Sequence, residues 1–551
     1  MADQRIQYTE ELVGANHATK SDTINRLSLV EHNNDGTHKS ANIYSDLVAK
    51  RPWVDVRAFG ATGDGATDDT AAIQDAINYA AANGLNVYAP EGHYKFTNLY
   101  FHYHATSNPG WPQTAGFEGK LAFFGDGAVS GYNYANDVWK RTVLESTDAT
   151  GPAIMIDGSG VGARLSNFKI SGMSIIANNT TSVFDIDVGN YYFILEELFI
   201  GQKGAGGGIL AEGIYTNFWR DVRIYGAGKT VSGCGLTVRS VAGQNGGGNN
   251  IFINVSTYNF ERGWEIGHAT YGSGEIITTV DCIGCEASTH KTYGVLVGHG
   301  AKNFNWIGSY IEKIQDGASG GIGMLVKHRA QCTLVKGSWF SDNDIGLQLG
   351  TNDADANQRA FDMAAVEGCN FQNILVDGVR KYSGLYSIGG IIRGNKFGQS
   401  ASAPGATSGV WAEDAAHRGL SVEDNEFSTG LTTPIVNAHR VNVLKNQSAN
   451  RTSVIKMSDV VSFAANDATP DVSDGRVFKT ANTATTVITA LDNGIAGQEA
   501  IIIFGDANTT VDFTGTNLKG NGGTDFTASF GDTMSAVFDG TNWYCAVANN
   551  T

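Results

Sequence analysis

Apolar and polar residues alternate in short units between Gly151 and about Asn446. Each unit contains an alternating strand, a small or polar corner, a second strand and a glycine-rich loop, and similar units recur about every 22 to 34 residues. Successive side chains of a strand point to opposite faces, so each unit turns one row of apolar residues inward. This pattern predicts a solenoid with one continuous core through its stacked units.

A four-residue piece within these units shows the repeat most clearly. A glycine or aspartate is followed by a small or polar residue, a variable residue and then a large apolar residue. A β-sandwich is the alternative, but it predicts frequent two-residue hairpins, which are scarce before residue 450. We therefore expect the large residue to face inward in every copy, and the copies begin at Gly308, Gly337, Gly368, Gly394 and Asp424.

A helical pattern precedes the solenoid, after the glycine-rich stretch 60–65. Asp68 and Asp69 are placed to cap the N-terminus of this helix, and Gly84 is placed to end it. A short buried strand, Val87–Ala89, should follow and close in a Pro-Glu-Gly turn. The helix is predicted because four apolar residues share one face, namely Ile73, Ala76, Ile77 and Ala80.

The character of the sequence changes near Asn450. Asp539-Gly540 is a strong hairpin signal, and it joins the apolar run 536–538 to the run 543–547. We expect a small antiparallel β-sandwich here. The predicted organisation is therefore an N-terminal segment at 1–52, a solenoid with its cap at 53–450 and a sandwich at 451–551.

Composition narrows the possible functions. The 551 residues include 70 glycines, which suits many turns with positive φ, and the 8 prolines occur without a G-X-Y period, which excludes collagen. The net charge of -17 argues against nucleic-acid binding, because a phosphate backbone needs a basic face. No apolar stretch is long enough to span a membrane, and no secretory signal is visible after Met1.

Six cysteines are spread through the chain, which is unlike a disulfide scaffold. Cys282 and Cys285 have C-x-x-C spacing, but no second pair and no histidine lies at zinc-site spacing. Buried structural thiols are favoured over metal or redox chemistry. We therefore predict no metal site and no cofactor.

The order of elements from Val54 to Tyr94 resembles the N-terminal cap of right-handed parallel β-helix proteins of the pectate-lyase-like class. With the segments Leu518–Gly523 and Phe538–Tyr544, the whole chain resembles a bacteriophage tailspike. The resemblance implies an all-β fold: a right-handed parallel β-helix with a short capping helix and a C-terminal antiparallel β-sandwich.

The same resemblance implies a parallel homotrimer of the phage tail that binds, and usually cleaves, a bacterial surface polysaccharide such as O-antigen or capsule. Residues 1–52 would then attach the protein to another phage tail or baseplate protein. A flexible leader is the alternative for this segment.

Glycosidic hydrolysis requires two carboxyl groups that flank the bond. Stacked rungs repeat every ~4.8 Å, so outward side chains on neighbouring rungs approach the spacing of such pairs. If Phe260, Ala287, Ile311 and Phe340 point inward, Glu261 and Glu312 share one outward column with Glu286 between them. The candidate catalytic residues are therefore Glu312, Asp342, Glu286, Glu261 and Asp344.

Large aromatic residues occupy the same region, and sugars stack on exposed aromatic faces. Tyr310 and Trp339 are predicted to face outward beside the carboxylates. The candidate substrate-binding residues are Tyr310, Trp339, Tyr258, Trp264 and Trp306.

In the hydrolytic hypothesis, Glu312 or Asp342 is the general acid and its partner carboxylate activates water. Exposed carboxylates on a solenoid can equally be ordinary solvated side chains. A polysaccharide lyase is a second possibility, with bases or neutralising groups available at Lys313, Lys327, His328 and Arg329. A spike that binds its receptor without cleaving it is the third.

Overall fold

The structure is a computed structural model that describes residues 52–550 apart from short internal segments. The expected attachment segment, residues 1–52, lies outside the described residues except for Pro52. The internal segments that are not described are 103–107, 111–120, 130–140, 157–166, 188–191, 241–246, 269–275, 316–319, 328–329, 352–361, 383–387, 399–407, 414–419, 429–430, 432, 437–440, 449–459, 474 and 495.

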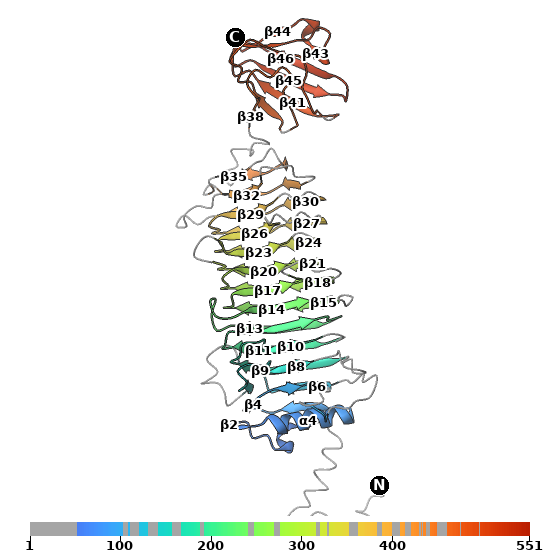
Figure 1. Cartoon of the computed structure of the whole chain (residues 1–551), viewed down its shortest axis with the longest axis vertical. Helices are drawn as coiled ribbons and strands as arrows, with labels where there is room; N and C mark the ends of the chain where they lie inside the picture. The colour runs from blue at the N-terminus through green and yellow to red at the C-terminus, as the bar shows by residue number, and fades with distance from the viewer. Residues whose placement is uncertain are drawn as a thin grey trace, which may run out of the picture.

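Three columns of parallel strands form a long β-helix, which is visible as stacked rungs in Figure 1. Within the described residues, the first and second columns are joined in a 25-stranded sheet, and the third column is a separate 12-stranded sheet. Strands β9, β11 and β13 are long enough to run through both of the first two columns. The predicted fold class, an all-β parallel β-helix, is confirmed.

The strands of the first column are β1 (Trp53–Asp55), β3 (Asn86–Ala89), β6 (Leu121–Gly125), β9 (Phe168–Ala177), β11 (Ile194–Gln202), β13 (Phe218–Tyr225), β15 (Gly247–Ile253), β18 (Ile277–Ile283), β21 (Ala301–Ile307), β24 (Gln331–Lys336), β27 (Asp362–Glu367), β30 (Ile388–Arg393), β33 (Leu420–Glu423) and β36 (Asn442–Leu444). Those of the second are β2 (Asp64–Asp68), β4 (Gly92–Phe96), β7 (Thr142–Ser146), β16 (Ser256–Tyr258), β19 (Glu286–Ser288), β22 (Tyr310–Glu312), β25 (Trp339–Ser341), β28 (Asn370–Gln372), β31 (Lys396–Gly398), β34 (Glu426–Phe427) and β37 (Gln447–Ser448). Those of the third are β5 (Leu99–Tyr100), β8 (Ile154–Ile156), β10 (Phe184–Ile186), β12 (Ile209–Glu212), β14 (Cys234–Arg239), β17 (Arg262–Ile266), β20 (Tyr293–Val297), β23 (Ile322–Val326), β26 (Ile345–Leu349), β29 (Asp377–Lys381), β32 (Ser408–Ala412) and β35 (Thr433–Val436).

A residue in the left-handed conformation turns the chain from the first column into the second. This corner residue is asparagine or aspartate in some rungs and glycine, with φ from 56° to 65°, in others, while Glu197 and Lys445 occupy it in two rungs. A Cβ atom added at Gly284, Gly308, Gly337 or Gly368 would meet nothing within 4 Å. The backbone conformation, rather than lack of space, therefore favours glycine here. The corner residues from β13 onward include Asp221, Asn254, Gly284, Gly308, Gly337, Gly368, Gly394 and Asp424.

The large residue of the predicted four-residue piece does face inward. Phe340, Phe371, Phe397 and Phe427 are at most 2% exposed, and successive rings stack with centroids 4.7 to 4.9 Å apart. Phe371, Phe397 and Phe427 pack against glycines of the third column; a Cβ atom added at Gly409, for example, would lie 2.4 Å from the Phe427 ring. Fully burying a phenylalanine side chain contributes roughly 1.5–3 kcal/mol, so this stack is a major part of the core.

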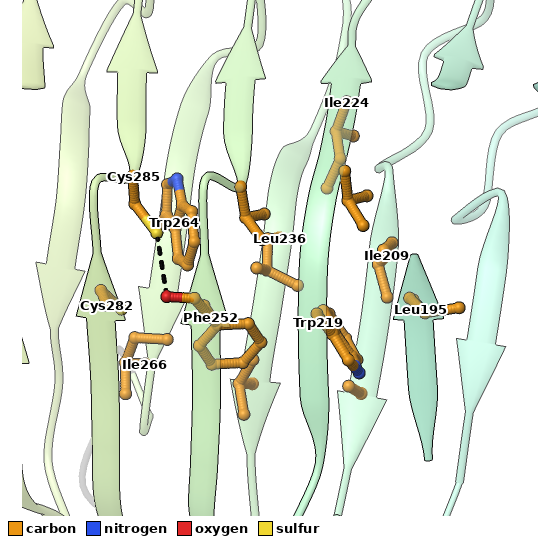
Figure 2. Packing of buried hydrophobic residues seen from close by; sticks show 14 of the residues in the cluster. Leu195, Ile209, Trp219, Ile224, Leu236, Phe252, Trp264, Ile266, Cys282 and Cys285 are labelled. Atoms are coloured by element: carbon orange, nitrogen blue, oxygen red, sulfur yellow. Dashed lines mark hydrogen bonds between the residues drawn. The ribbon is translucent and has the colours of Figure 1, made fainter. Parts of the chain in front are cut away.

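Further toward the N-terminus, tryptophan and aliphatic residues fill the interior. Trp219, Phe252 and Trp264 lie between the columns in Figure 2, with neighbouring rings in edge-to-face contact. Cys282 and Cys285 are buried beside them, and the Cys285 thiol lies 3.4 Å from the Phe252 carbonyl oxygen that it contacts. The prediction that these two cysteines are buried thiols is confirmed.

Helix α4 (Thr70–Asn83) closes the N-terminal end of the stack in Figure 1, after the short helix η1 (Val56–Phe59). Its predicted apolar face is buried, and Gly84 ends it with φ 66°. The Asp68 carboxylate accepts the Thr70 amide at 3.0 Å and so caps the helix. Asp69 was expected to do the same, but its buried carboxylate instead accepts two amides of the glycine-rich turn, which positions that turn.

The C-terminal region has its own hydrophobic core, centred on residues such as Phe478, Ile502 and Trp543. Where the chain is described, six strands form one sheet and three form another: β38 (Val460–Ser462), β39 (Val477–Lys479), β41 (Glu499–Ile503), β45 (Thr533–Phe538), β46 (Trp543–Ala548) and β43 (Leu518–Gly520), with β40 (Thr486–Ile488), β42 (Thr509–Val511) and β44 (Phe526–Thr527). The short helix η4 (Asn521–Gly523) follows β43.

The predicted hairpin joins β45 to β46 through Asp539-Gly540, with Phe538 opposite Trp543. Strand pairing in this sandwich is mixed rather than purely antiparallel, since β39 runs parallel to both β38 and β41. None of the helices in the described part of the chain is both long and apolar enough to cross a membrane.

Candidate functional site

Acidic and aromatic residues gather on the outer face of the second column. Strands β16, β19, β22 and β25 are three residues long, so the middle residue of each points inward and the first and third point outward. The first outward row is Ser256, Glu286, Tyr310 and Trp339, and the second is Tyr258, Ser288, Glu312 and Ser341. These eight residues are called the carboxylate face below.

Glu286 is half-buried on this face. The Tyr258 hydroxyl donates a hydrogen bond to its carboxylate, and the Trp264 indole N–H donates to its backbone carbonyl at 3.3 Å. Burial raises the pKa of Glu286, and the neighbouring Glu312 charge raises it further, although the Tyr258 hydrogen bond opposes the shift. Glu286 therefore holds its proton to a higher pH than an ordinary glutamate does.

Three donors converge on the carboxylate of Glu312. The Tyr310 hydroxyl donates at 2.7 Å, the Ser288 hydroxyl at 3.0 Å and the Lys313 ammonium group at 3.3 Å. The side chain of Glu312 is 17% exposed, so it is accessible but constrained. A hydrogen-bonded carboxylate beside a carboxyl group of raised pKa is an arrangement that suits general acid–base catalysis.

Aromatic rings lie on both sides of the two glutamates. Tyr225 stacks on Tyr258 with ring centroids 4.4 Å apart, and Tyr310 meets Trp339 edge to face at 5.6 Å. Trp339 is 44% exposed, in agreement with its predicted outward orientation. Exposed rings in line with carboxylates can hold the apolar faces of sugar units.

Three of the predicted site residues are buried and need correction. Trp264 and Trp306 are 0% exposed and point into the core, where their rings contact each other edge to face, so they cannot line a substrate groove. Figure 2 shows Trp264 among the core residues. Asp344 is 1% exposed and accepts the Gly321 amide at 2.8 Å, which makes it a structural residue.

Two further candidates lie beside the carboxylate face rather than on its rows. Glu261 is exposed on the turn between β16 and β17, whereas Tyr258 occupies the row that leads to Glu312. The error came from the rung register, because Thr257 rather than Phe260 is in register with Ala287. Asp342 is the left-handed corner residue after β25, with φ 53°, and accepts a hydrogen bond from the Ser341 hydroxyl.

Sequence reasoning missed three residues of this region: Tyr225, Arg223 and Ser288. Arg223 and Tyr225 extend the two rows of the carboxylate face by one rung. The sequence contained a signal for these residues, because the outward residues of each rung lie two and four positions after its left-handed corner residue. For Arg223 and Tyr225, this corner residue is Asp221. Counting from the corners would have aligned Tyr225, Tyr258, Ser288 and Glu312.

Two family models match separate parts of the chain. Residues 53–282 match the rhamnogalacturonase A/epimerase, pectate lyase-like model. Residues 459–544 match the phage depolymerase C-terminal β-sandwich domain. Together, the two matches support a phage tailspike parallel β-helix. The resemblance inferred from its cap and C-terminal segments is thereby confirmed.

Several relatives share shorter stretches with this chain. Mannuronan C5-epimerase AlgE1 of Azotobacter vinelandii is 30% identical over 250 residues, 42% of this chain and 16% of that protein. Plasmin and fibronectin-binding protein A of Streptococcus pneumoniae is 42% identical over 81 residues, 13% of this chain and 11% of that protein. The chain thus spans less than a fifth of the length of either relative.

Solved structures whose backbone is similar to that of this chain include the A-module of the Azotobacter vinelandii mannuronan C-5 epimerase AlgE6. It has 18% identity and a TM-score of 0.46, over 72% of this chain and 99% of that one. Tailspike protein 3 of bacteriophage CBA120 has 12% identity and a TM-score of 0.44, over 77% of this chain and 64% of that one.

Proposed function

We propose that this protein binds a bacterial surface polysaccharide, O-antigen or capsule, and depolymerises it by endo-glycosidic hydrolysis at the carboxylate face. The observation that carries the proposal is the half-buried Glu286, with its raised pKa, beside the accessible Glu312. Glu286 donates its proton to the leaving glycosidic oxygen. Glu312 takes a proton from the water that attacks the anomeric carbon, so each hydrolysis leaves one new reducing end.

The spacing of the two residues favours an inverting reaction. Glu286 is in register with Tyr310, two residues before Glu312, so the two glutamates are one rung and two residues apart. With strands 4.8 Å apart and a rise of 3.3 Å per residue, their Cα atoms are about 8 Å apart. Parallel side chains would keep the carboxyl groups near the ~6.5–9.5 Å that leaves room for a water molecule.

The setting of this reaction is also part of the proposal. We infer a homotrimer carried on the phage tail, with residues 1–52 attached to another tail or baseplate protein. The match of residues 459–544 to a phage depolymerase domain supports this placement. Trp339 and Tyr225 would hold sugar units on either side of the scissile bond.

Product analysis tests the proposal. The protein is incubated with a panel of purified capsule and O-antigen polysaccharides, and fragments are weighed by mass spectrometry. Hydrolysis adds one water per cleaved bond, and Glu286→Gln and Glu312→Gln should each abolish release. Asp342→Asn is the matched amide control and should retain activity. Full activity in both glutamine variants, or loss only in the Asp342 variant, would contradict the assignment.

A polysaccharide lyase is the second candidate, because the Arg223 and Lys313 charges act on this same face and can neutralise a uronate carboxylate. Two of the groups considered for this role, His328 and Arg329, lie outside the described residues. Lys327 directly follows the last residue of β23. A lyase produces an unsaturated end that absorbs near 235 nm without addition of water. Binding to host cells without fragment release would instead favour a purely receptor-binding spike.

A further inference from the structure

A polar cavity of about 280 Å³ opens on the outer face of the third column. Strands β12, β14 and β17 form its floor, and the corner segments 180–182 and 205–207 form its rim. Its volume lies just below the ~300–1,000 Å³ typical of small-molecule sites, so it has room for about one sugar unit. No residue of the carboxylate face lines it.

Paired charges dominate the wall of this cavity. The Arg262 guanidinium group donates to the Glu265 carboxylate at 3.1 Å, and the Tyr293 hydroxyl also approaches that carboxylate, at 3.3 Å. Arg239 is paired in the same way with Glu212 at 2.6 Å. Each arginine therefore has its own carboxylate, although Glu212 lies beside the cavity and not in its lining.

The wall also carries a donor that is left unsatisfied. The Nε atom of Arg262 is buried and has no hydrogen-bond partner, whereas buried polar groups in proteins are almost always paired. Glu265, only 5% exposed, is an acceptor on the same strand, and Thr237 adds a hydroxyl group from β14. The Arg262 side chain is 35% exposed and lines the cavity, so an acceptor placed there could reach its guanidinium group, and a donor beside it could reach Glu265.

We propose that this cavity is a non-catalytic subsite for one neutral, hydroxyl-bearing sugar unit of the polysaccharide. Adjacent hydroxyl groups supply one acceptor for Arg262 and one donor for Glu265. A uronate would place its own charge beside the buried Glu265 carboxylate, which is unfavourable. The inference rests on the proposed function, since it assigns a second contact to the same ligand.

The position of the cavity explains what such a subsite does. Tyr258 of the carboxylate face and Arg262 of the cavity lie on either side of one corner, four residues apart in sequence. A long polysaccharide that crosses the carboxylate face can bend around this corner and reach the cavity. A short fragment cannot engage both, so the subsite raises affinity for polymer and leaves the chemistry on fragments unchanged.

A filling variant and a matched control test the subsite. Leu210 lines the cavity, and Val436 lies in the same outward row of the third column, eight strands further on. Leu210→Trp fills the cavity, whereas Val436→Trp adds the same ring elsewhere. The probes are galactose, glucose, mannose, rhamnose, N-acetylglucosamine and glucuronate. Ligand-observed NMR measures the binding of each probe to the full chain.

At least one neutral sugar should bind the wild type and Val436→Trp, and its affinity should fall 10-fold or more in Leu210→Trp. Thr237→Val, which removes only a hydroxyl group, should weaken the same sugar about threefold and covers the case in which Leu210→Trp does not fold. Three results would overturn the inference. Glucuronate could be the only sugar whose binding depends on the cavity, neutral-sugar binding could be unchanged in both Leu210→Trp and Thr237→Val, or no sugar could bind the wild type.

The two proposals fail in different ways. Glu286→Gln should keep the neutral-sugar signal while it loses polysaccharide cleavage. If the wild type binds the sugar in the cavity but releases no fragments from any polysaccharide, only the catalytic proposal fails. If it cleaves polymer and Leu210→Trp changes neither sugar binding nor the KM for polymer, only the subsite fails.

Discussion

The middle rungs of the second column and the later rungs share one backbone plan but differ in what they carry. In the later rungs, from β25 to β34, the inward residue is always phenylalanine and the rings stack continuously. In the middle rungs, β16, β19 and β22, the inward residues are Thr257, Ala287 and Ile311. The outward residues show the opposite distribution: both catalytic candidates, Glu286 and Glu312, lie in the middle rungs.

This difference shows that the two faces of a strand column can be chosen independently. Inward residues contribute the burial energy that holds the rungs together, and outward residues are free to carry chemistry. In the middle rungs, the second column has smaller inward residues. Trp264 and Trp306, which are buried elsewhere in the same cross-section, compensate for them. Substitutions on the two faces should therefore separate stability from activity.

The largest expected effect is on turnover. Glu286→Gln should lower kcat by about 10²–10⁴-fold, the usual contribution of a general acid, with little change in unfolding. Glu426→Gln is the matched control, because Glu426 occupies the same outward row in the later rungs and is exposed. Reducing-end release measures the rate. Comparable loss in both variants would show that the row, and not the middle rung, is what matters.

The largest effect on stability should come from the later rungs. Phe371→Ala removes the ring between Phe340 and Phe397 and should lower the free energy of unfolding by about 3–5 kcal/mol. Cleavage by the folded fraction should persist. Trp339→Ala, an outward aromatic in the same region, should change stability by only about 0.5 kcal/mol while it weakens polysaccharide binding. Denaturant unfolding measures the stability of both variants. Equal losses of stability in Phe371→Ala and Trp339→Ala would contradict the separation of the two faces.

The corner residues are common to both regions and should have an intermediate effect. Gly368 has φ 61° and open space around its α-carbon, so Gly368→Val introduces backbone strain alone, about 1–2 kcal/mol. Gly368→Asn should cost less, since Asn254 occupies the equivalent corner with φ 53°. Thermal unfolding of the two variants measures the difference. Similar midpoints would argue that the corner conformation is not the limiting factor.

The smallest effect is a shift in pH dependence. Tyr258 donates to Glu286 and thereby opposes the burial that raises the pKa of this glutamate. Tyr258→Phe removes that hydrogen bond, so Glu286 should stay protonated to a still higher pH. The basic limb of kcat/KM should then move upward by a fraction of a pH unit. Ser256→Ala is the control on the same strand, and a downward shift in the Tyr258 variant would contradict the role of Glu286 as the acid.

Local sequence determined much of this protein. A left-handed backbone requirement favours the glycine, asparagine and aspartate found at most corners. The large apolar fourth residue of the repeated piece, phenylalanine in four of the five copies, recurs often enough to be recognised. Helix α4 follows from the spacing of Ile73 and its neighbours, and the β45–β46 hairpin from Asp539-Gly540. Each of these features depends on residues within a few positions of one another.

Only the tertiary structure decided which residues share the carboxylate face. A three-residue strand bounded by corners does not reveal its own register, so Phe260 was placed where Thr257 belongs, and Glu261 where Tyr258 belongs. Trp264 and Trp306 were chosen because aromatic residues gather in this part of the sequence, but their strands turn both rings into the core. Glu286 and Glu312 become neighbours because hydrogen bonds between rungs fix one register across 26 residues, and alternation within either strand alone cannot specify that register.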